Sequence, residues 1–394
     1  MISQDEALRR ILAHVQPLSP RAVELWQAVG SFAAEDVSAR FASPPFDNSA
    51  MDGYAVVASF CTPGARLRIV GEQPAGLDRG LRMAAGEAIR ILTGAPLPVG
   101  ADAVVMQEDV RSEETEIVIN ERVEEGEFIR RRGGDVAEGQ KILSRGERIT
   151  AQIAALLAAQ GFAETNVGGA ARATIISTGD ELAPAGAALQ PGQIYDSNSV
   201  LLHALLTNCR AQIIRAEHCP DRAAEIEAAI RRALDSSDIL ILTGGVSVGA
   251  RDLVKPALTA AGATLDLWRV AVKPGKPFLF GRAAQCLIFG LPGNPVSAFV
   301  TFQLLVRPAL MKLMGAAEHH LLLPVVTAAI ADAASNPGDR PHYLRGILRD
   351  GIFTLGGRQE SHALFGLSRA NALLQVQPRT TLAAGASASV LLLD

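Results

Sequence analysis

The sequence predicts a multidomain protein of the α/β plus β class. It has a central parallel-sheet α/β domain, a small mostly β domain before it and a C-terminal β-barrel or sandwich. Between residues 172 and 316, strand-like and helix-like segments alternate, which is typical of a parallel sheet with helices on both faces. Before and after that region, short β-like runs are separated by glycine and proline. The 394 residues exceed what one core holds and suggest roughly two to four domains.

The region before the α/β domain is predicted to begin with a helix and to continue mainly as strands. Ser3 to Glu6 has the spacing of a capping box, and apolar residues follow at helical spacing as far as Val15. A second amphipathic stretch runs from Arg21 to Ala28. A loop of turn residues and acids at 42–53 leads into a strand at 54–57. Further expected elements are strands at 67–70, 88–92, 103–107 and 116–120, and a helix at 149–160 that Gly161 ends.

The α/β domain is predicted to contain at least six strands and four helices. The expected strands are 173–177, 212–216, 239–242, 265–270, and 278–280 paired with 286–289. The expected helices are 196–206, 220–234, 252–261 and 295–313. Short apolar runs at 344–348, 373–376 and 389–393 return to a β pattern.

The composition is that of a soluble globular protein, with 48% hydrophobic and 20% charged residues. A net charge of -4 argues against broad nucleic-acid binding. The N-terminus is polar and acidic, unlike a signal peptide, and no apolar run suggests a membrane span, so we expect a cytoplasmic protein. The four cysteines form no C-x-x-C pair and are expected as buried thiols. The seven histidines show none of the spacings of zinc sites, so zinc is not expected.

The stretch from Asp238 to Asp252 provides the first candidate site. Four consecutive aliphatic residues predict a strand buried on both faces, and a loop with three glycines, 243–249, follows it. Backbone N–H groups can approach a ligand closely where Cβ atoms are absent, and ligands bind at the carboxyl ends of strands in open α/β sheets. The loop is therefore a candidate phosphate or anion cradle.

Two other loops carry acids and hydroxyls. Ser177 to Leu182 follows the first strand of the α/β domain, and Asp180 and Glu181 could hold Mg²⁺ through their oxygens. A turn capped by Asp180 explains the same residues. Asp196, Ser197 and Asn198 could bind an anion or a ring edge at a helix N-terminus, and helix capping alone would explain them equally well.

The loop Lys273–Pro277 is best explained by function. Two prolines and a glycine fix its backbone, so that Lys273 and Lys276 can both be presented to one anion. The segment Leu291–Ser297 places a donor-rich turn before a helix that begins at Pro295, and a structural turn is about as good an interpretation.

A serine hydrolase is a further hypothesis, because the letters of 245–249 satisfy the pattern G-x-S-x-G around Ser247. The neighbouring loops offer cations and carboxylates rather than a histidine base, so this reading is weaker. A Walker A sequence is absent.

Taken together, five segments in order resemble the molybdopterin molybdenumtransferase family, the molybdenum insertases that include the E domain of gephyrin. They are 45–55, 177–182, 243–249, 273–277 and 291–297. The resemblance implies an elongated homodimer of four-domain subunits with a molybdopterin-binding-like α/β domain. The implied domains are 1–44 with 138–171 (linker and dimerisation), 45–137 (small mostly β), 172–316 (α/β, catalytic) and 317–394 (C-terminal β-barrel).

The resemblance also implies a reaction in which molybdate attacks adenylylated molybdopterin, the dithiolene takes up the metal, and AMP leaves with Mg²⁺ assisting. A contact with the molybdopterin adenylyltransferase fits this scheme. The implied catalytic residues are Asp52, Asp135, Asp180, Glu181, Asp221, Asp252, Lys273 and Lys276. The implied pterin-nucleotide contacts are Thr178, Gly179, Asp196, Ser197, Asn198, Gly244, Gly245, Ser247, Gly249, Pro292, Gly293, Asn294 and Pro295. The implied molybdate contacts are Lys273, Lys276, Arg345 and Ser361, and the implied Mg²⁺ ligands are Asp180, Glu181 and Asp252.

The sequence departs from the family at two places. Residues 250–253 keep only the acid of a longer family pattern, and Glu360 and His362 stand where small residues are usual. A Glu360 side chain that pointed into the site would repel an anion. A non-catalytic scaffold or binding module of the same fold is therefore the second hypothesis for this chain.

Overall fold

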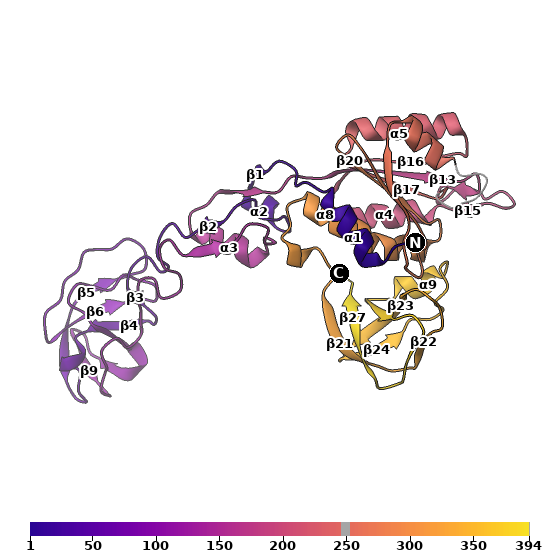
Figure 1. Ribbon diagram of the computed structural model, residues 1–394. Helices are drawn as coiled ribbons and strands as arrows, with labels where there is room; N and C mark the ends of the chain where they lie inside the picture. Colours follow the sequence, from indigo (N-terminus) through magenta and orange to yellow (C-terminus); the bar gives the residue numbers. More distant parts are fainter. Residues whose placement is uncertain (246–252, 394) are drawn as a thin grey trace. The chain divides into compact units, whose positions relative to one another are not determined.

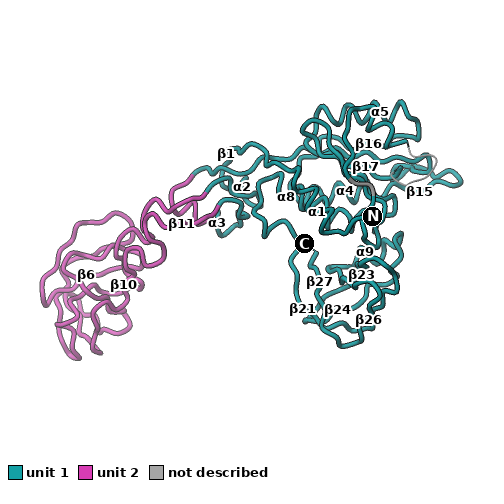
Figure 2. Tube along the Cα trace, viewed as in Figure 1, with its two compact units in different colours: residues 1–35, 145–154, 163–394 teal, residues 36–144, 155–162 magenta. Residues whose placement is uncertain are grey.

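The computed structural model describes residues 1–245 and 253–393. The chain divides into two compact units (Figure 2). Unit 1 comprises residues 1–35, 145–154 and 163–394, and unit 2 comprises residues 36–144 and 155–162. The chain therefore leaves unit 1 after residue 35 and returns to it at residue 145.

Unit 2 is built on a six-stranded sheet with the order β7-β4-β6-β5-β9-β8. Its strand β4 is buried along its whole length, because Tyr54 and Val56 pack in one apolar cluster while Ala55 packs in another. The sheet strands are β4 (Gly53–Val56), β5 (Arg66–Gln73), β6 (Glu87–Ile91), β7 (Ala103–Met106), β8 (Val110–Ser112) and β9 (Glu116–Ile119). The smaller elements are β2 (Val37–Ser38) with β11 (Lys141–Leu143), β3 (Asn48–Ser49) with β10 (Ile129–Arg130), and the 3₁₀ turns η1 (Ala58–Phe60) and η2 (Gln107–Asp109).

The first elements of unit 1 agree with the capping-box prediction. Helix α1 (Gln4–Ala13) is capped by Ser3, whose hydroxyl accepts from the Glu6 N–H at 3.2 Å. The amphipathic stretch at 21–28 divides into strand β1 (Arg21–Glu24) and a single helical turn, α2 (Leu25–Ala28). β1 is extended because it pairs antiparallel with β12 (Glu164–Val167). Helix α3 (Ala151–Ala159) precedes Gly161, which has a positive φ of 71°.

The central sheet of unit 1 has the order β16-β13-β17-β20-β19-β18. The first four strands run parallel, as predicted, but β19 is antiparallel to β20 and β18 is antiparallel to β19. The prediction of a parallel sheet is therefore wrong for this edge, because two residues join β19 to β20 and so short a turn permits only antiparallel pairing. The strands are β13 (Arg172–Thr178), β16 (Gln212–Cys219), β17 (Ile239–Thr243), β18 (Thr264–Arg269), β19 (Pro277–Ala283) and β20 (Cys286–Leu291), with a small pair β14 (Leu182–Ala183) and β15 (Ile194–Tyr195) beside them.

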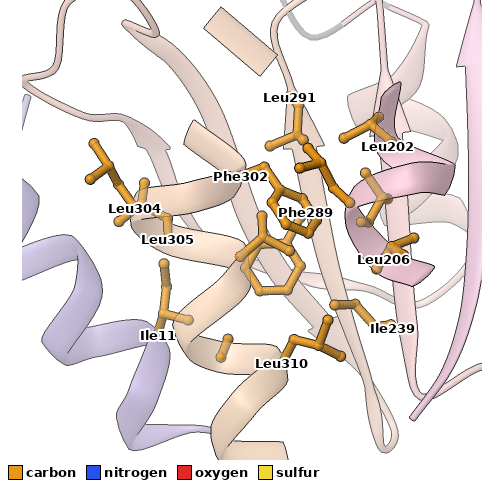
Figure 3. Close-up of a cluster of buried hydrophobic side chains, with 14 of the residues drawn as sticks. Ile11, Leu202, Leu206, Ile239, Phe289, Leu291, Phe302, Leu304, Leu305 and Leu310 are labelled. Atoms are coloured by element: carbon orange, nitrogen blue, oxygen red, sulfur yellow. The ribbon is translucent and has the colours of Figure 1, made fainter. Parts of the chain in front are cut away.

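Helices cover both faces of the central sheet (Figure 1). Along β17, Ile239 and Ile241 pack in the larger apolar cluster, whereas Leu240 and Leu242 pack in the cluster on the opposite face. Figure 3 shows the larger cluster, where Phe289 lies among side chains of α1, α4 and the long C-terminal helix of this domain. One face carries α5 (Ala223–Ser236) and α6 (Val254–Ala260), and the other carries α1, α4 (Ser197–Asn208), α7 (Pro295–Thr301) and α8 (Arg307–Leu313).

The helix predicted at 295–313 forms as one continuous segment with a π-helical stretch, η3 (Phe302–Val306), between α7 and α8. Pro308 explains the wider turn, because proline has no N–H to donate and would clash with the carbonyl of residue 304 in an α-helix. Within the described residues, this is the one helix apolar and long enough to cross a membrane, contrary to the expectation that no run has that length. Nearly all of it is buried, so it serves as the core helix of unit 1.

The C-terminal region is a closed barrel with the strand order β21-β24-β23-β25-β27, as predicted. Its interior contains Leu344, Phe353 and Leu374. The strands are β21 (Val325–Ile330), β23 (His342–Arg349), β24 (Ile352–Leu355), β25 (Ala372–Val376) and β27 (Ser387–Leu392), accompanied by the pair β22 (Ala334–Asn336) and β26 (Thr380–Leu382), by helix α9 (Leu364–Ser368) and by the 3₁₀ turn η4 (Glu318–His320). All four cysteines lie among the described residues, where each is a free thiol, and Cys61, Cys219 and Cys286 are buried.

Candidate functional site

The carboxyl ends of three parallel strands meet at one edge of the central sheet. Ser177 of β13 is in register with Thr243 of β17, which is in register with Leu291 of β20. A cavity of about 650 Å³, the strand-end cavity, opens at this edge. It is lined by Thr178, Glu181, Leu182, Ile194, Tyr195, Asp196, Ser197, Asn198, Thr243, Gly244, Gly245, Pro277, Pro292, Gly293, Asn294, Pro295, Ser297, His362 and Leu364.

Gly244 and Gly245 follow β17 directly, and both have positive φ, at 82° and 61°. A Cβ atom on Gly244 would lie 2.3 Å from the carbonyl oxygen of Thr178, and one on Gly245 would lie 2.7 Å from the Thr178 hydroxyl. The backbone therefore turns here in a conformation and a space that only glycine permits. Both glycines lie at the cavity, as the sequence predicted.

Asn198, in the first turn of α4, joins three of the loops that line the cavity. Its Nδ2 donates to Thr243 Oγ1 at 2.8 Å and to the carbonyl of Gly293 at 2.8 Å. Thr243 Oγ1 in turn lies 3.4 Å from the carbonyl of Pro292. The segment 291–297 is therefore held against the end of β17 and the start of α4 by side-chain hydrogen bonds.

Two oxygen atoms at the cavity are buried and have no hydrogen-bond partner among the described residues, Thr178 Oγ1 and Asn198 Oδ1. Buried polar groups are normally paired, and an unmet one costs about 1–3 kcal/mol. These atoms are therefore candidates for contacts with a bound ligand.

Asp196 is the N-cap of α4, and its two carboxylate oxygens accept from the Ser199 N–H at 3.0 Å and the Ser199 hydroxyl at 2.6 Å. Burial would raise the pKa of Asp196, but hydrogen bonds from Ser177 and Ser199 outweigh it and hold the pKa below its ordinary value. Asp196 is thus a charged cap, and it also lines the cavity beside Ser197.

Three carboxylates gather beside the cavity. Asp180 Oδ1 accepts from the backbone N–H of Asp221 at 3.0 Å. Partial burial, followed by the charges of Asp180 and Glu181, holds the pKa of Asp221 above its ordinary value. Glu181 lines the cavity, and one of its carboxylate oxygens lies 2.5 Å from where a Cβ on Gly179 would be, so the carboxylate lies against the backbone of Gly179. Carboxylates offer the oxygen atoms that Mg²⁺ prefers, but the ligand oxygens of these three residues do not all lie within 4.8 Å of one another.

The loop Lys273–Pro277 joins β18 to β19 and lies against the C-terminal barrel. The Lys273 N–H donates to the carbonyl of Pro341 at 2.9 Å, and its own carbonyl accepts from the Tyr343 N–H at 2.8 Å. Lys273 is half-buried and Lys276 is exposed. The loop reaches the cavity at Pro277.

Arg345 lies on β23 and is fully buried. Its Nη2 donates to the carbonyls of Arg358 at 2.5 Å and Glu360 at 3.3 Å. Nε and Nη1 have no hydrogen-bond partner in the described part of the chain. A buried guanidinium with two unused donors is expensive, and this is the state in which it can still receive an anion.

The loop beyond Arg345 connects it to the cavity. Ser361 Oγ accepts from Asn294 Nδ2 at 2.8 Å, and the Ser361 carbonyl accepts from the Val296 N–H at 3.1 Å. Of the two residues that depart from the family pattern, His362 lines the cavity, whereas Glu360 is exposed.

His342 is a buried residue that the sequence did not single out. It pairs with Lys273 in a parallel β-bridge, and its Nδ1 has no partner among residues 1–245 and 253–393. Burial, followed by neighbouring positive charges, lowers the pKa of His342 to about 4. Those charges belong to Lys273, Arg345 and Arg340. We call Lys273, Arg340, His342 and Arg345 the cationic seam, since they lie where the lysine loop meets the barrel.

Not every predicted residue lies at this site. Asp52 and Asp135 are exposed residues of unit 2. Asp52 accepts from the N–H and hydroxyl of Thr93 at 2.7 and 2.8 Å, and these bonds hold its pKa below the ordinary value. The predicted residues Ser247, Gly249 and Asp252 lie outside the described residues.

The sequence also missed part of the cavity wall, namely Ile194, Tyr195 and Leu364. Ile194 and Tyr195 are largely exposed apolar residues directly before the cap Asp196. An apolar pair ahead of a helix cap is the signal that could have indicated them.

Fold and site together define a multidomain protein with a cavity at the carboxyl edge of an α/β domain, and with a buried arginine and half-buried basic residues where the lysine loop meets the barrel. The chain matches three family descriptions in order: the MoeA N-terminal region (domain I and II) over residues 2–161, a probable molybdopterin binding domain over residues 174–312, and the MoeA C-terminal region (domain IV) over residues 327–393.

Similar proteins of known name agree. The molybdopterin molybdenumtransferase of Haemophilus influenzae is 40% identical over 80% of this chain and 78% of its own. Molybdopterin molybdenumtransferase 2 of Mycobacterium tuberculosis is 37% identical over 95% of each chain. The crystal structure of the molybdopterin biosynthesis moeA protein from Pyrococcus horikoshii superposes with a TM-score of 0.86 at 29% identity, over 100% of both chains.

The chain belongs to the molybdopterin molybdenumtransferase family and is an enzyme of molybdenum cofactor biosynthesis. This finding favours the enzyme over the two other hypotheses, a non-catalytic scaffold and a serine hydrolase.

Proposed function

We propose that this enzyme inserts molybdenum from molybdate into adenylylated molybdopterin and releases AMP in a Mg²⁺-dependent reaction. One observation carries the proposal: the strand-end cavity and the cationic seam adjoin each other through Ser361 and through the loop that begins at Lys273. A pterin nucleotide and a small oxyanion can thus be held side by side.

The strand-end cavity suits the pterin nucleotide. Gly244 and Gly245 let a phosphate approach the backbone, and the start of α4 adds N–H groups. The unsatisfied oxygens of Thr178 and Asn198 can accept hydrogen bonds from ring N–H groups. Apolar atoms of Ile194 and Tyr195 offer a surface for a flat ring.

The cationic seam suits molybdate, which is a substrate and carries two negative charges. Lys273 and Arg345 of the seam and Lys276 of the same loop would supply charge-assisted donors, and Ser361, outside the seam, would supply a hydroxyl. A molybdate oxygen attacks the phosphoanhydride phosphorus, and the bond to AMP breaks. The two thiols of the dithiolene lose their protons and become ligands of the metal in place of that oxygen, so the atoms balance without a further reactant.

Asp180, Glu181 and Asp221 fit a role in holding Mg²⁺, because carboxylate oxygens are its preferred ligands and burial, followed by the charges of Asp180 and Glu181, raises the pKa of Asp221. Asp252, outside the described residues, is proposed as a further ligand. Bound there, Mg²⁺ would neutralise charge on the phosphate oxygens as AMP leaves. The protein's own part is to keep Glu181 close to Gly179 and facing the cavity.

We further propose the four-domain division 1–44 with 138–171, 45–137, 172–316 and 317–394, and a cytoplasmic homodimer that receives its substrate from the molybdopterin adenylyltransferase. In that dimer, Asp52 and Asp135 would contribute acids to the site of the other subunit. Size-exclusion chromatography with light scattering tests the dimer.

The proposal is tested by incubating purified protein with molybdate, Mg²⁺ and adenylylated molybdopterin and measuring AMP. We expect release that depends on molybdate and falls by at least about a hundredfold in Lys276→Ala. Lys141→Ala, which removes an exposed lysine of unit 2 paired with Asp36, is the matched control and should retain activity. Absence of AMP release by the unmodified protein would overturn the proposal.

A further inference from the structure

Three side chains that the proposed reaction does not use meet on the surface of unit 1. Glu147 Oε1 lies 3.0 Å from His319 Nε2, and Glu147 Oε2 lies 3.1 Å from His320 Nε2. One donor atom from each of the three lies within 4.8 Å of the others. We propose that Glu147, His319 and His320 form a binding site for a divalent transition metal, with Zn²⁺ as the best fit.

The donor separations suit one ion. Zinc binds imidazole nitrogen and carboxylate oxygen at about 2.0–2.2 Å, and two such ligands at a tetrahedral angle are about 3.3 Å apart. The two nitrogen–oxygen separations are 3.0 and 3.1 Å, each to a different oxygen of Glu147, and all the ligand atoms lie within 4.8 Å of one another. His319 is 61% exposed, so solvent can supply the remaining ligands.

The two loops that carry these ligands are already fixed against each other. The Ala317 N–H donates to the carbonyl of Gly146 at 2.9 Å, and a Cβ on Gly146 would lie 2.7 Å from that nitrogen. The Ala33 N–H donates to the carbonyl of Glu147 at 2.9 Å, and the His320 ring packs on Phe32 at 5.7 Å. Little ordering is therefore needed when a metal binds.

The charges also favour a cation. The two imidazoles have ring centres 4.2 Å apart, and both rings have a nitrogen within about 3 Å of a Glu147 carboxylate oxygen. One divalent ion placed between the two imidazoles and the carboxylate would contact all three groups at once. Nitrogen donors select zinc, cobalt or nickel over Mg²⁺, which prefers oxygen.

A metal bound at this site would join two connecting segments of unit 1. Glu147 lies just after the chain returns from unit 2 at residue 145, and His319 and His320 lie between α8 and the barrel strand β21. Glu147 and His320 are 173 residues apart, which is why the spacing of histidines in the sequence gave no sign of a site. A metal that binds only the folded chain raises its melting temperature.

The test uses full-length protein freed of metal with a chelator. Zinc titration by calorimetry should show uptake of one ion by this site, and Co²⁺ should give visible absorption bands that Zn²⁺ abolishes. Glu147→Gln and His319→Ala should each weaken zinc binding at least about tenfold, which is about 1.4 kcal/mol. His203→Ala, an exposed histidine of α4, is the matched control and should bind as the unmodified protein does.

The inference is overturned if the unmodified protein takes up no zinc, or if Glu147→Gln and His319→Ala bind it as tightly as the control. In either case the three side chains are an ion-paired surface cluster only. AMP release with Mg²⁺ is a separate readout, so failure of the zinc site leaves the proposed reaction standing.

Discussion

The strand-end cavity and the cationic seam adjoin each other, yet they consist of different kinds of residue. Among its described residues, the cavity is lined without lysine or arginine, and its polar groups are glycine backbone, hydroxyls, amides, carboxylates and the imidazole of His362. The seam consists of two arginines, a lysine and a buried histidine. The cavity therefore recognises shape and hydrogen bonds, whereas the seam recognises charge.

The two regions also differ in how much free energy their unpaired buried polar groups cost the folded protein. In the cavity, two unsatisfied oxygens are small penalties. In the seam, the penalties are large. They come from a fully buried guanidinium with two unpaired nitrogens and from a histidine whose pKa is lowered. We infer that binding of the anion recovers more free energy at the seam than the pterin recovers from the unsatisfied atoms of the cavity.

The largest effect is expected for Arg345→Met. Molybdate-dependent AMP release should fall by at least about a hundredfold, because the variant lacks the buried donor that we propose for the oxyanion. The free energy of unfolding should stay equal or rise, since a poorly paired buried charge is removed. Arg349→Met, an exposed residue at the end of β23, is the control for both measurements. A strong loss of stability in Arg345→Met alone would mean that the charge serves the fold.

The next effect is a pH dependence of stability. The pKa of His342 is about 4 in the folded chain and near 6.5 unfolded, so the unfolded chain binds the extra proton between these values. Above about pH 6.5 His342 does not lower the free energy of unfolding. As pH falls towards 4, the free energy of unfolding decreases by roughly 2–3 kcal/mol because of this residue. Thermal melts from pH 7 to 4.5 should show a shallower decline in His342→Gln. Parallel curves for the two proteins would contradict the assignment.

A smaller effect is expected at the cavity for Gly244→Ala. The affinity for a pterin nucleotide should fall roughly tenfold, because a Cβ would push against the Thr178 carbonyl and shift the loop. Gly262→Ala is matched to it, since Gly262 has a φ of 84° but no atom near the added Cβ. Both variants should lose about 1 kcal/mol of stability from the backbone conformation. Equal binding by the two would show that the close approach is unimportant.

The smallest effect is expected for Thr178→Val, which removes a buried hydroxyl without a partner in the described chain. Stability of the ligand-free protein should be unchanged or slightly higher, while pterin-nucleotide affinity falls by about 1 kcal/mol. Calorimetric titration and thermal melts of the same samples separate the two. Weakened stability with unchanged affinity would show that the hydroxyl has no ligand role.

The sequence predicted the residues whose role is local. The cap Asp196, the glycines after β17 and the turn before Pro295 all lie at the cavity, because strand ends of a parallel sheet share one edge. His342 could not be predicted in the same way, since its importance depends on the pairing of its strand with Lys273. Such long-range contacts leave no local pattern. The reversed strand β19 was missed for a related reason, as apolar runs show where a strand is but not its direction.

The reversal of β19 determines where the lysines lie. In an all-parallel sheet, the segment before a strand lies at the amino edge, so the loop 273–276 would begin a seven-residue strand about 20 Å from the cavity. Because β19 runs backwards, with Leu279 opposite Gly290, its first residue stands beside the carboxyl end of β20. The two-residue turn between these strands therefore decides at which edge of the sheet the lysine loop lies. Replacing it with a helical crossover would send both lysines to the far side of the sheet with no change in any residue of the site.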